Sequence, residues 1–393
     1  MSPLRPAIWS RDFTLLWLAN FLMALSFYFL LPTVPTFATE VLGADKGQVG
    51  YLVGLFTVAA LATRPLAGYL LDARGRKVTY LGGLLFFALF VFSYQTATAF
   101  WLLLAVRFLH GTTWGVISTG GSTVAADLLP PERRGEGLGY YGIAMTLAMA
   151  LGPMLALALA GDSRYTLVFL AAGGVASLAA LMAMAVRYRE VPPSGRGFSW
   201  DSFVDLRVVP IALIYLITML TYGGLITFLT LFTAERGLNA GLFFLVYAAV
   251  MSLSRPLSGR VQDRLGPTPV LITGFLLLIA GFLVMSLTRT APLFWVAASL
   301  MGVGNGNIWP TLTAMGINLV EPSRRGVASS TLFSAIDLGI GLGSMVMGWV
   351  AEAVGLSGMY LVSAGLLVAP LVIYLLYVRP YYQMRVSAHD EPA

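Results

Sequence analysis

Long apolar runs, each followed by a short polar segment, extend along almost the whole chain. Each run holds the roughly 20 mainly apolar residues that an α-helix needs to cross a bilayer. We therefore predict an all-α membrane protein with twelve transmembrane helices. The predicted spans are residues 13–38, 48–71, 78–96, 98–126, 137–160, 165–187, 208–233, 241–262, 268–288, 291–319, 327–352 and 356–379.

Basic residues are distributed unevenly between the two sides that these spans define. Most of the 24 lysines and arginines fall in loops on the side of the N-terminus. Cytoplasmic loops of membrane proteins carry such an excess of Lys and Arg. The pattern predicts a multi-pass protein of the inner membrane with both termini in the cytoplasm. The basic residues on the opposite side are Lys46, Arg164, Arg236 and Arg289.

The longest polar stretch between spans, residues 188–207, lies near the middle of the chain and is rich in Pro and Gly. Such a composition is typical of a connecting loop. We interpret it as a cytoplasmic linker between an N-terminal six-helix bundle, residues 1–187, and a C-terminal six-helix bundle with a short cytoplasmic tail, residues 208–393.

The two halves repeat one another. The pattern R-P-x-x-G-x-x-x-D-x-x-G occurs at residues 64–75 and again, 191 residues later, at 255–266. The same offset relates Arg133-Arg134-Gly135 to Arg324-Arg325-Gly326 and Gly152 to Gly343. The repeat predicts two pseudo-symmetric bundles, which suit a transporter whose halves rock about a site at the midplane. A duplicated membrane scaffold that transports nothing is the alternative.

Composition excludes other classes of protein. Only 11% of residues are charged, 58% are hydrophobic and mean hydropathy is +0.81, whereas about 25% of a soluble domain is charged. The chain has no cysteine and two histidines, so neither thiol chemistry nor a metal site is expected. No catalytic motif or P-loop is evident, and we predict neither enzyme activity nor a cofactor. Membrane orientation explains the net charge of +6, so no nucleic-acid partner is expected.

The loop between the second and third spans reads Gly68-x-Leu70-x-Asp72-x-x-Gly75-Arg76-Lys77. It resembles the signature G-x-L-a-D-r-x-G-R-K of the major facilitator superfamily, with Ala73 at a position where Arg is common. The resemblance covers nearly the whole chain, and it implies alternating access between two six-helix bundles.

The fifth span carries Gly152-Pro153, which partly resembles the motif G-P-x-x-G-G of the twelve-span drug:proton antiporters. Ala156 and Leu157 stand where that motif has glycines. The resemblance favours this branch and export over import, and it implies that Gly152 and Pro153 act as a hinge.

The signature loop also predicts a conformational gate from its chemistry. Gly68 permits close approach of a helix, and Asp72 lies within reach of a helix N-terminus or a basic partner. Arg76 and Lys77 can pair with acids such as Asp127. Simple anchoring by positive charge is the alternative. The predicted gate comprises Gly68, Asp72, Gly75, Arg76, Lys77 and Asp127, with Arg255 and Asp263 from the second half.

Arg107, His110 and Asp337 are the candidates for proton coupling. Arg107, His110 and Trp114 share one helix face, and Arg107 with Gly111 resembles the family's span-four motif R-x-x-x-G, which implies a role in proton transfer. A histidine side chain ordinarily titrates near neutral pH, which makes His110 a candidate proton carrier. The alternatives are an Arg107 held by the backbone of the first span or by Asn20, and a His110 that is only structural.

Asp337 is the only acid that the pattern places deep in a span. An unpaired carboxylate there would be protonated or paired, so we expect it to load and release a proton. The alternatives are a neutral Asp337 bonded to a neighbouring helix and an ion pair with an in-span Arg.

By resemblance, the first, fourth, seventh and tenth spans surround a substrate cavity. Charge is sparse there, which favours apolar or amphipathic solutes. The sequence thus predicts a monomeric, proton-coupled exporter of small molecules, with an importer or uniporter as alternative and a receptor or scaffold as a remote one. The cavity candidates are Asn20, Tyr28, Trp114, Tyr222, Thr227, Asn305, Asn307 and Trp309.

Overall fold

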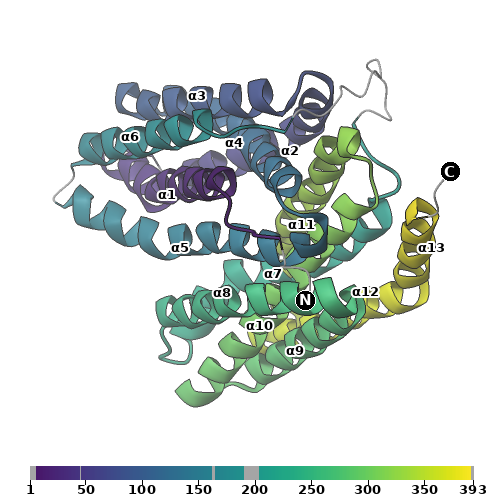
Figure 1. Ribbon diagram of the computed structural model, residues 1–393. Coiled ribbons are helices and arrows are strands. Elements are labelled where there is room, and N and C mark those ends of the chain that lie inside the picture. Colours follow the sequence, from purple (N-terminus) through teal and green to yellow (C-terminus); the bar gives the residue numbers. More distant parts are fainter. Residues whose placement is uncertain (1–5, 45, 162–163, 190–202, 391–393) are drawn as a thin grey trace. The chain divides into compact units, whose positions relative to one another are not determined.

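The computed structural model describes residues 6–44, 46–161, 164–189 and 203–390 (Figure 1). Helices form nearly all of these residues, and the part of the chain so described contains no strand. The prediction of an all-helical chain is confirmed. Most of the predicted linker, residues 190–202, lies outside the described residues, so the predicted domain boundaries stay a prediction.

Six helices form the first half of the chain, and each coincides with a predicted span. Ser10 begins the first helix, because its hydroxyl accepts a hydrogen bond from the N–H of Phe13 at 3.1 Å. Gly75, with φ +96°, makes the turn before the third helix. The six are α1 (Arg11–Glu40), α2 (Lys46–Ala73), α3 (Arg76–Ser93), α4 (Phe100–Leu128), α5 (Arg134–Ala160) and α6 (Tyr165–Met184).

The second half contains six further spans. Gly355, with φ +74°, breaks the helical run that begins at Arg325, close to the predicted boundary between the last two spans. A π-helical turn, Tyr374–Val378, joins the last two short helices. The helices are α7 (Val209–Ala234), α8 (Ala240–Leu265), α9 (Pro267–Leu287), α10 (Ala291–Asn318), α11 (Arg325–Leu366), α12 (Val368–Ile373) and α13 (Arg379–Asp390).

Ten helical stretches within the described ranges are long and apolar enough to cross a membrane. One of them, Pro322–Arg385, contains the break at Gly355 and so holds two spans. α10 is not among the ten, because Asn305, Asn307 and four glycines lower its hydropathy. Its 28 residues are nevertheless enough to cross the hydrocarbon core at 1.5 Å per residue.

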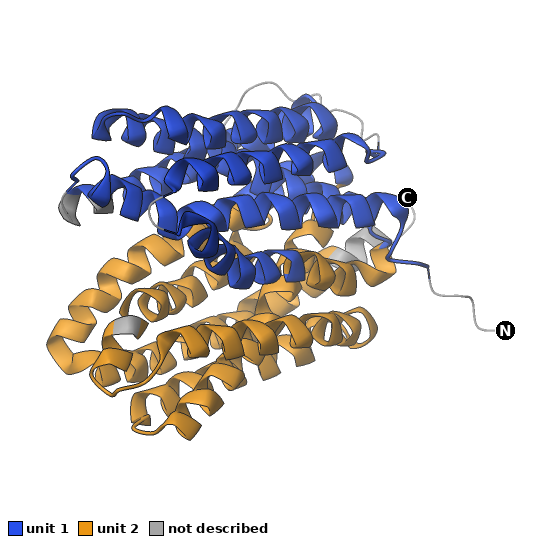
Figure 2. Ribbon diagram, turned by 90° about the vertical axis from the view of Figure 1, so that its left-hand side faces the viewer, with its two compact units in different colours: residues 1–130, 143–204, 322–330 blue, residues 131–142, 205–321, 331–393 orange. Residues whose placement is uncertain are grey.

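Contacts divide the chain into two compact units (Figure 2). Unit 1 comprises residues 1–130, 143–204 and 322–330, and unit 2 comprises residues 131–142, 205–321 and 331–393. The N-terminal turns of α11 therefore belong to unit 1, although the rest of α11 belongs to unit 2. The N-terminal turns of α5 belong in the same way to unit 2.

The packing inside the two units follows one pattern. In unit 1, α4 packs against α2 and α3, and α6 packs against α1. In unit 2, α10 packs against α8 and α9, and α12 packs against α7. Corresponding helices of the two units thus have corresponding partners within their own unit, as the internal repeat predicts.

Glycines bring α11 against α7 inside unit 2. A Cβ added at Gly339 would lie 2.6 Å from the carbonyl oxygen of Leu216, and one added at Gly343 would overlap the carbonyl oxygen of Leu220. Small residues allow such close approach of helices where no hydrophobic effect drives their association. Gly341 faces the other way and has open space where a Cβ would stand.

These two glycines give a matched test of the packing. We expect Gly343→Ala to lower the free energy of unfolding by about 1–3 kcal/mol, because the added methyl must push α11 away from α7. Gly341→Ala should be neutral or stabilising, since Ala favours a helix by up to about 1 kcal/mol over Gly. Thermal unfolding in detergent measures both, and equal stability of the two variants would contradict this packing.

Candidate conformational gate and substrate site

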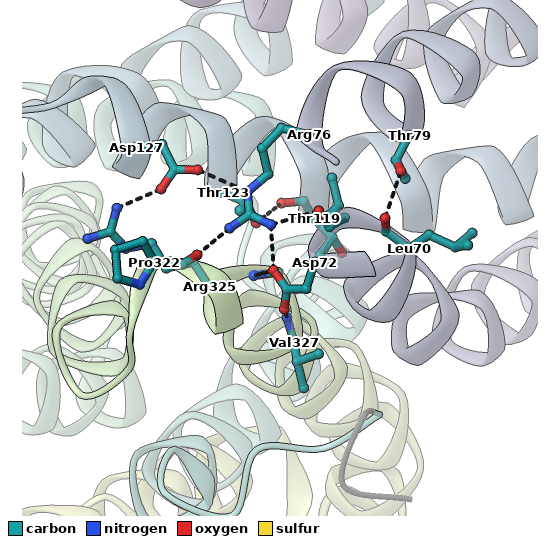
Figure 3. A network of polar contacts seen from close by, with 12 residues as sticks. Leu70, Asp72, Arg76, Thr79, Thr119, Thr123, Asp127, Pro322, Arg325 and Val327 are labelled. Carbon is teal, nitrogen blue, oxygen red and sulfur yellow. Dashed lines mark hydrogen bonds and ion pairs between the residues drawn. The ribbon is translucent and has the colours of Figure 1, made fainter. Parts of the chain in front are cut away.

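The carboxylate of Asp72 lies at the N-terminus of α11, inside unit 1 (Figure 3). Its two oxygens accept hydrogen bonds from the N–H groups of Gly326, at 2.9 Å, and Val327, at 2.8 Å. These leading N–H groups have no partner within their own helix, and the positive end of the helix dipole favours an anion. Asp72 therefore caps a helix that begins 253 residues after it.

Two glycines allow this approach. A Cβ at Gly68 would lie 2.6 Å from Cβ of Ser330, and a Cβ at Gly326 would lie 2.7 Å from an oxygen of Asp72. Ser330 also donates its hydroxyl to the carbonyl oxygen of Arg64 at 2.7 Å. Larger side chains at Gly68 or Gly326 would separate the cap from its helix.

Arg76 joins Asp72 to a second carboxylate, that of Asp127 at the end of α4 (Figure 3). Its Nε lies 3.0 Å from Asp127, and it also donates to the carbonyl oxygens of Leu71 and Pro322. Arg325 bonds the other oxygen of Asp127 at 2.6 Å. Two buried carboxylates and two buried guanidinium groups thus alternate in one chain of ion pairs. Such pairing offsets the cost of burying these charges away from water.

A second copy of the cap lies in unit 2. Asp263 accepts hydrogen bonds from the N–H groups of Gly135, at 3.0 Å, and Glu136, at 2.9 Å, at the N-terminus of α5. Gly135 and Glu136 are the repeat counterparts of Gly326 and Val327, which donate to Asp72. The repeat in the sequence is therefore also a repeat of this interaction.

The charges around the two caps differ. Asn318 is the counterpart of Asp127, and it accepts from Arg134, the counterpart of Arg325. The second acid beside the cap in unit 2 is Glu136, which pairs with Arg133 at 2.7 Å and with Arg260 at 2.6 Å. Sequence reasoning missed Arg325, Asn318 and Glu136, although the offset of 191 residues from Arg134 and Asp127 points to the first two.

The structure does not group all the predicted gate residues together. Lys77 is exposed, and Gly75 acts through the backbone turn that begins α3. Arg255 lies about two turns before Asp263 on α8, and its guanidinium contacts Met251 and the ring of Trp309. Arg255 thus lies with cavity candidates of unit 2.

Arg107, His110 and Trp114 share one face of α4, because all three contact the ring of Phe56. Arg107 donates to the backbone carbonyl of Leu52, in the second span, at 3.2 Å and to the hydroxyl of Tyr94 at 3.3 Å. The backbone that holds Arg107 is thus that of the second span and not that of the first.

Tyr94 links the two titratable groups of this cluster. Its hydroxyl lies 2.9 Å from Nδ1 of His110, and the ring of His110 is fully buried. Within the described part of the chain, Nε2 of His110 has no hydrogen-bond partner. Asp337 is half-buried on α11 and belongs to unit 2, so the three predicted coupling residues fall in different units.

The cavity candidates of unit 1 lie on α1 and α4. Trp114 stacks on Phe27 with 4.2 Å between ring centroids, and Asn20 is buried. Tyr28 packs against Gly152, where a Cβ would overlap its side chain. Gly152 is thus a close contact between α1 and α5, followed by Pro153 within the helix.

Three of the five candidates in unit 2 come together. The rings of Tyr222 and Trp309 lie 5.5 Å apart, and Asn305 donates to the hydroxyl of Tyr247 at 2.9 Å beside them. Thr227 instead donates to Ser344 at 2.9 Å. Asn307 lies against Gly274 on α9.

Comparison with known proteins defines the class of this chain. Residues 16–245 and 211–392 match the family model described as Major Facilitator Superfamily. Membership of this family makes the chain a multi-pass secondary transporter and not an enzyme. It belongs to the Major Facilitator Superfamily.

Relatives of known sequence cover most of the chain. An uncharacterised MFS-type transporter of Burkholderia mallei (strain SAVP1) is 29% identical over 346 residues, which are 85% of this chain and 84% of that protein. An uncharacterised MFS-type transporter of Methanocaldococcus jannaschii is 22% identical over 367 residues, which are 90% of this chain and 95% of that protein.

Solved structures confirm the twelve-helix fold. The human organic anion transporter MFSD10 matches with a TM-score of 0.81 and 22% identity, over 92% of this chain and 98% of that one. A variant of the E. coli fucose:proton symporter FucP matches with a TM-score of 0.75 and 18% identity, over 95% of this chain and 98% of that one. Identities this low establish the shared fold alone.

The difference between Asp127 and Asn318 provides a test of the charged network. We expect Asp127→Asn to lower the free energy of unfolding by about 3–5 kcal/mol, because Arg76 and Arg325 lose a shared carboxylate while buried. Asn318→Asp, beside Arg134, should change it by less than about 1 kcal/mol. Chemical denaturation in detergent measures both, and a loss below about 1 kcal/mol for Asp127→Asn would contradict the role of its charge.

Proposed function

We propose that this transporter exports small hydrophobic or amphipathic compounds by alternating access, driven by the proton gradient. The observation that carries alternating access is the Asp72 cap together with the ion pairs of Arg76, Asp127 and Arg325. This network ties the start of α11, a segment of the second repeat, to helices of the first. A buried network of this kind has two discrete states, bonded and separated, which a conformational switch requires.

Two groups in the spans support coupling to protons. Asp337 lies half-buried in α11, and acidic residues within membrane spans typically mark proton pathways. Arg107, Tyr94 and His110 form a buried hydrogen-bonded chain with a free acceptor or donor position at Nε2 of His110 among the described residues. A ligand shifts a conformational equilibrium only through different affinities for the two states, so these groups must meet different surroundings in each.

The partial G-P-x-x-G-G motif at Gly152-Pro153 supports export. Proton-coupled import is the second candidate, and the structural relative named as a fucose:proton symporter favours it. We also propose that the protein lies in the inner membrane with both termini in the cytoplasm and acts as a monomer, with its substrate, protons and lipid as partners. A receptor or scaffold that transports nothing is the remote alternative.

Gradient-driven flux tests the coupling role of Asp337. We expect Asp337→Asn to lower accumulation driven by an imposed pH gradient at least tenfold while substrate exchange without a gradient continues. The measurement uses proteoliposomes and a panel of anionic, neutral and cationic amphipathic dyes. Orientation is read by labelling Lys77→Cys, which we expect to react from the cytoplasmic side, in a chain that has no other cysteine.

Glu352→Gln is the matched control, because Glu352 is an exposed acid further along α11. It should keep full gradient-driven flux. The proton-coupling role of Asp337 is wrong if Asp337→Asn keeps it as well. Absence of flux of every dye in the wild type would instead favour the receptor or scaffold.

A second prediction concerns the gate. We expect Asp72→Asn to slow transport at least tenfold with substrate affinity changed less than about threefold, because an amide accepts through one oxygen only and carries no charge for Arg76. Dye flux and equilibrium dye binding measure the two quantities separately. Lys77→Gln, an exposed position of the same loop, should leave both unchanged, whereas an equal effect of the two variants would favour simple anchoring by positive charge.

A further inference from the structure

The repeated arginines Arg64 and Arg255 have different surroundings. Arg64 is 2% exposed, and its Nη1 donates to the hydroxyls of Ser118, at 2.9 Å, and Thr119, at 3.3 Å. Both hydroxyls come from α4 of the same unit. Arg64 is therefore held by polar groups of its own bundle.

The counterparts of Ser118 and Thr119 in α10 are Trp309 and Pro310, which bring no hydroxyl to Arg255. The guanidinium carbon of Arg255 lies 5.7 Å from the ring centroid of Trp309, and Nη2 lies 3.7 Å from the sulfur of Met251. Arg255 is 5% exposed. The second repeat has thus replaced a hydroxyl pair with an aromatic face while it kept the charge.

Aromatic side chains of unit 2 gather beside Trp309, whose ring lies next to Arg255. Tyr215 donates its hydroxyl to the backbone carbonyl oxygen of Trp309. The ring centroid of Tyr222 lies 5.5 Å from that of Trp309, with the rings nearly perpendicular, and 6.4 Å from that of Tyr247, with the rings stacked. The rings of Trp309, Tyr222 and Tyr247 offer several faces and edges to a planar apolar ligand.

Two buried polar atoms of the cluster are unsatisfied. Among the described residues, Nε1 of Trp309 and Oδ1 of Asn305 have no hydrogen-bond partner, and Asn305 is 2% exposed. A buried donor or acceptor without a partner costs about 1–3 kcal/mol. Such a cost is expected where a ligand supplies the missing partner.

The sequence leaves room for the guanidinium at this place. A Cβ at Gly142 would lie 3.0 Å from Cζ of Arg255, so any larger residue would displace the head group. Gly142 belongs to unit 2 with the rest of the cluster. The position of the charge is thus built into two helices, α5 and α8.

We propose that Arg255, Trp309 and Tyr222 form a subsite for an organic anion, and that the substrate joins a carboxylate to an aromatic or other apolar body. The inference rests on the proposed transport function, whose substrate class it names. A guanidinium offers paired donors that match a carboxylate, and the N–H of Trp309 adds a further donor. The attraction is strong in surroundings of low dielectric constant, and the rings hold the apolar body.

Three naphthalene compounds of similar shape and different charge test the subsite: 2-naphthylacetate, its neutral amide 2-naphthylacetamide, and the cation of 2-(2-naphthyl)ethylamine. Binding to the full-length protein in detergent at neutral pH is measured by equilibrium dialysis. We expect the carboxylate to bind at least tenfold more tightly than the amide, and the cation more weakly than either.

Variants then locate the preference. Arg255→Gln should lower the affinity for the carboxylate at least tenfold and leave the affinity for the amide within about twofold. Arg255→Lys should keep part of the preference, because charge remains while the paired donors are lost. Trp309→Phe, which keeps the ring and removes the N–H, should lower the carboxylate affinity about threefold, and it tests the subsite even if Arg255→Gln does not fold.

Arg64→Gln is the matched control, since it removes the repeat counterpart and should leave the preference for the carboxylate unchanged. The proposed subsite is overturned if the three compounds bind the wild type equally, if 2-naphthylacetate does not bind, or if Arg64→Gln and Arg255→Gln lower its affinity alike. Equilibrium binding needs no gradient. Flux of neutral or cationic dyes without anion preference would overturn the subsite alone, and anion preference without any flux would overturn the transport proposal alone.

Discussion

The structure of each unit depends on a carboxylate that meets the N-terminus of a helix. A helix in a bilayer satisfies its own backbone except at its ends, and a helix that begins beside other helices needs an acceptor for its leading N–H groups. Asp72 supplies it to α11 and Asp263 supplies it to α5. The glycines around these contacts and the ion pairs of Arg76 and Asp127 follow from this requirement, because close approach and charge balance are both conditions for a buried cap.

The two repeats keep the cap and differ in what surrounds it. Asp127 and its two arginines extend the first cap into a chain of ion pairs, whereas the amide of Asn318 faces Arg134 in the second. The in-span arginines differ in the same manner, since Arg64 meets hydroxyls and Arg255 meets Trp309. Duplication supplies two copies of each position, so one copy can preserve the packing while the other acquires a polar role.

Charges are scarce in these spans, and each buried one has a defined setting. Arg107 is held by the carbonyl of Leu52 and the hydroxyl of Tyr94, under the face of Phe56. A charge in a membrane interior is costly and persists where it has partners or a task. Arg107, Arg76 and Arg64 have such partners. The tasks that we propose concern Arg255 and His110.

The sequence by itself determined the number of spans, their limits to within a few residues, the repeat of 191 residues and the kinds of partner that Asp72 would take. Span length and repetition are properties of the linear chain, and apolar runs record them directly. Only the tertiary structure decided that Tyr94 joins Arg107 to His110, that Arg325 shares Asp127 with Arg76, and that Arg255 faces Trp309 although its motif suggested the gate. The rotation and crossing of packed helices choose such partners, and no short-range pattern along the chain encodes them.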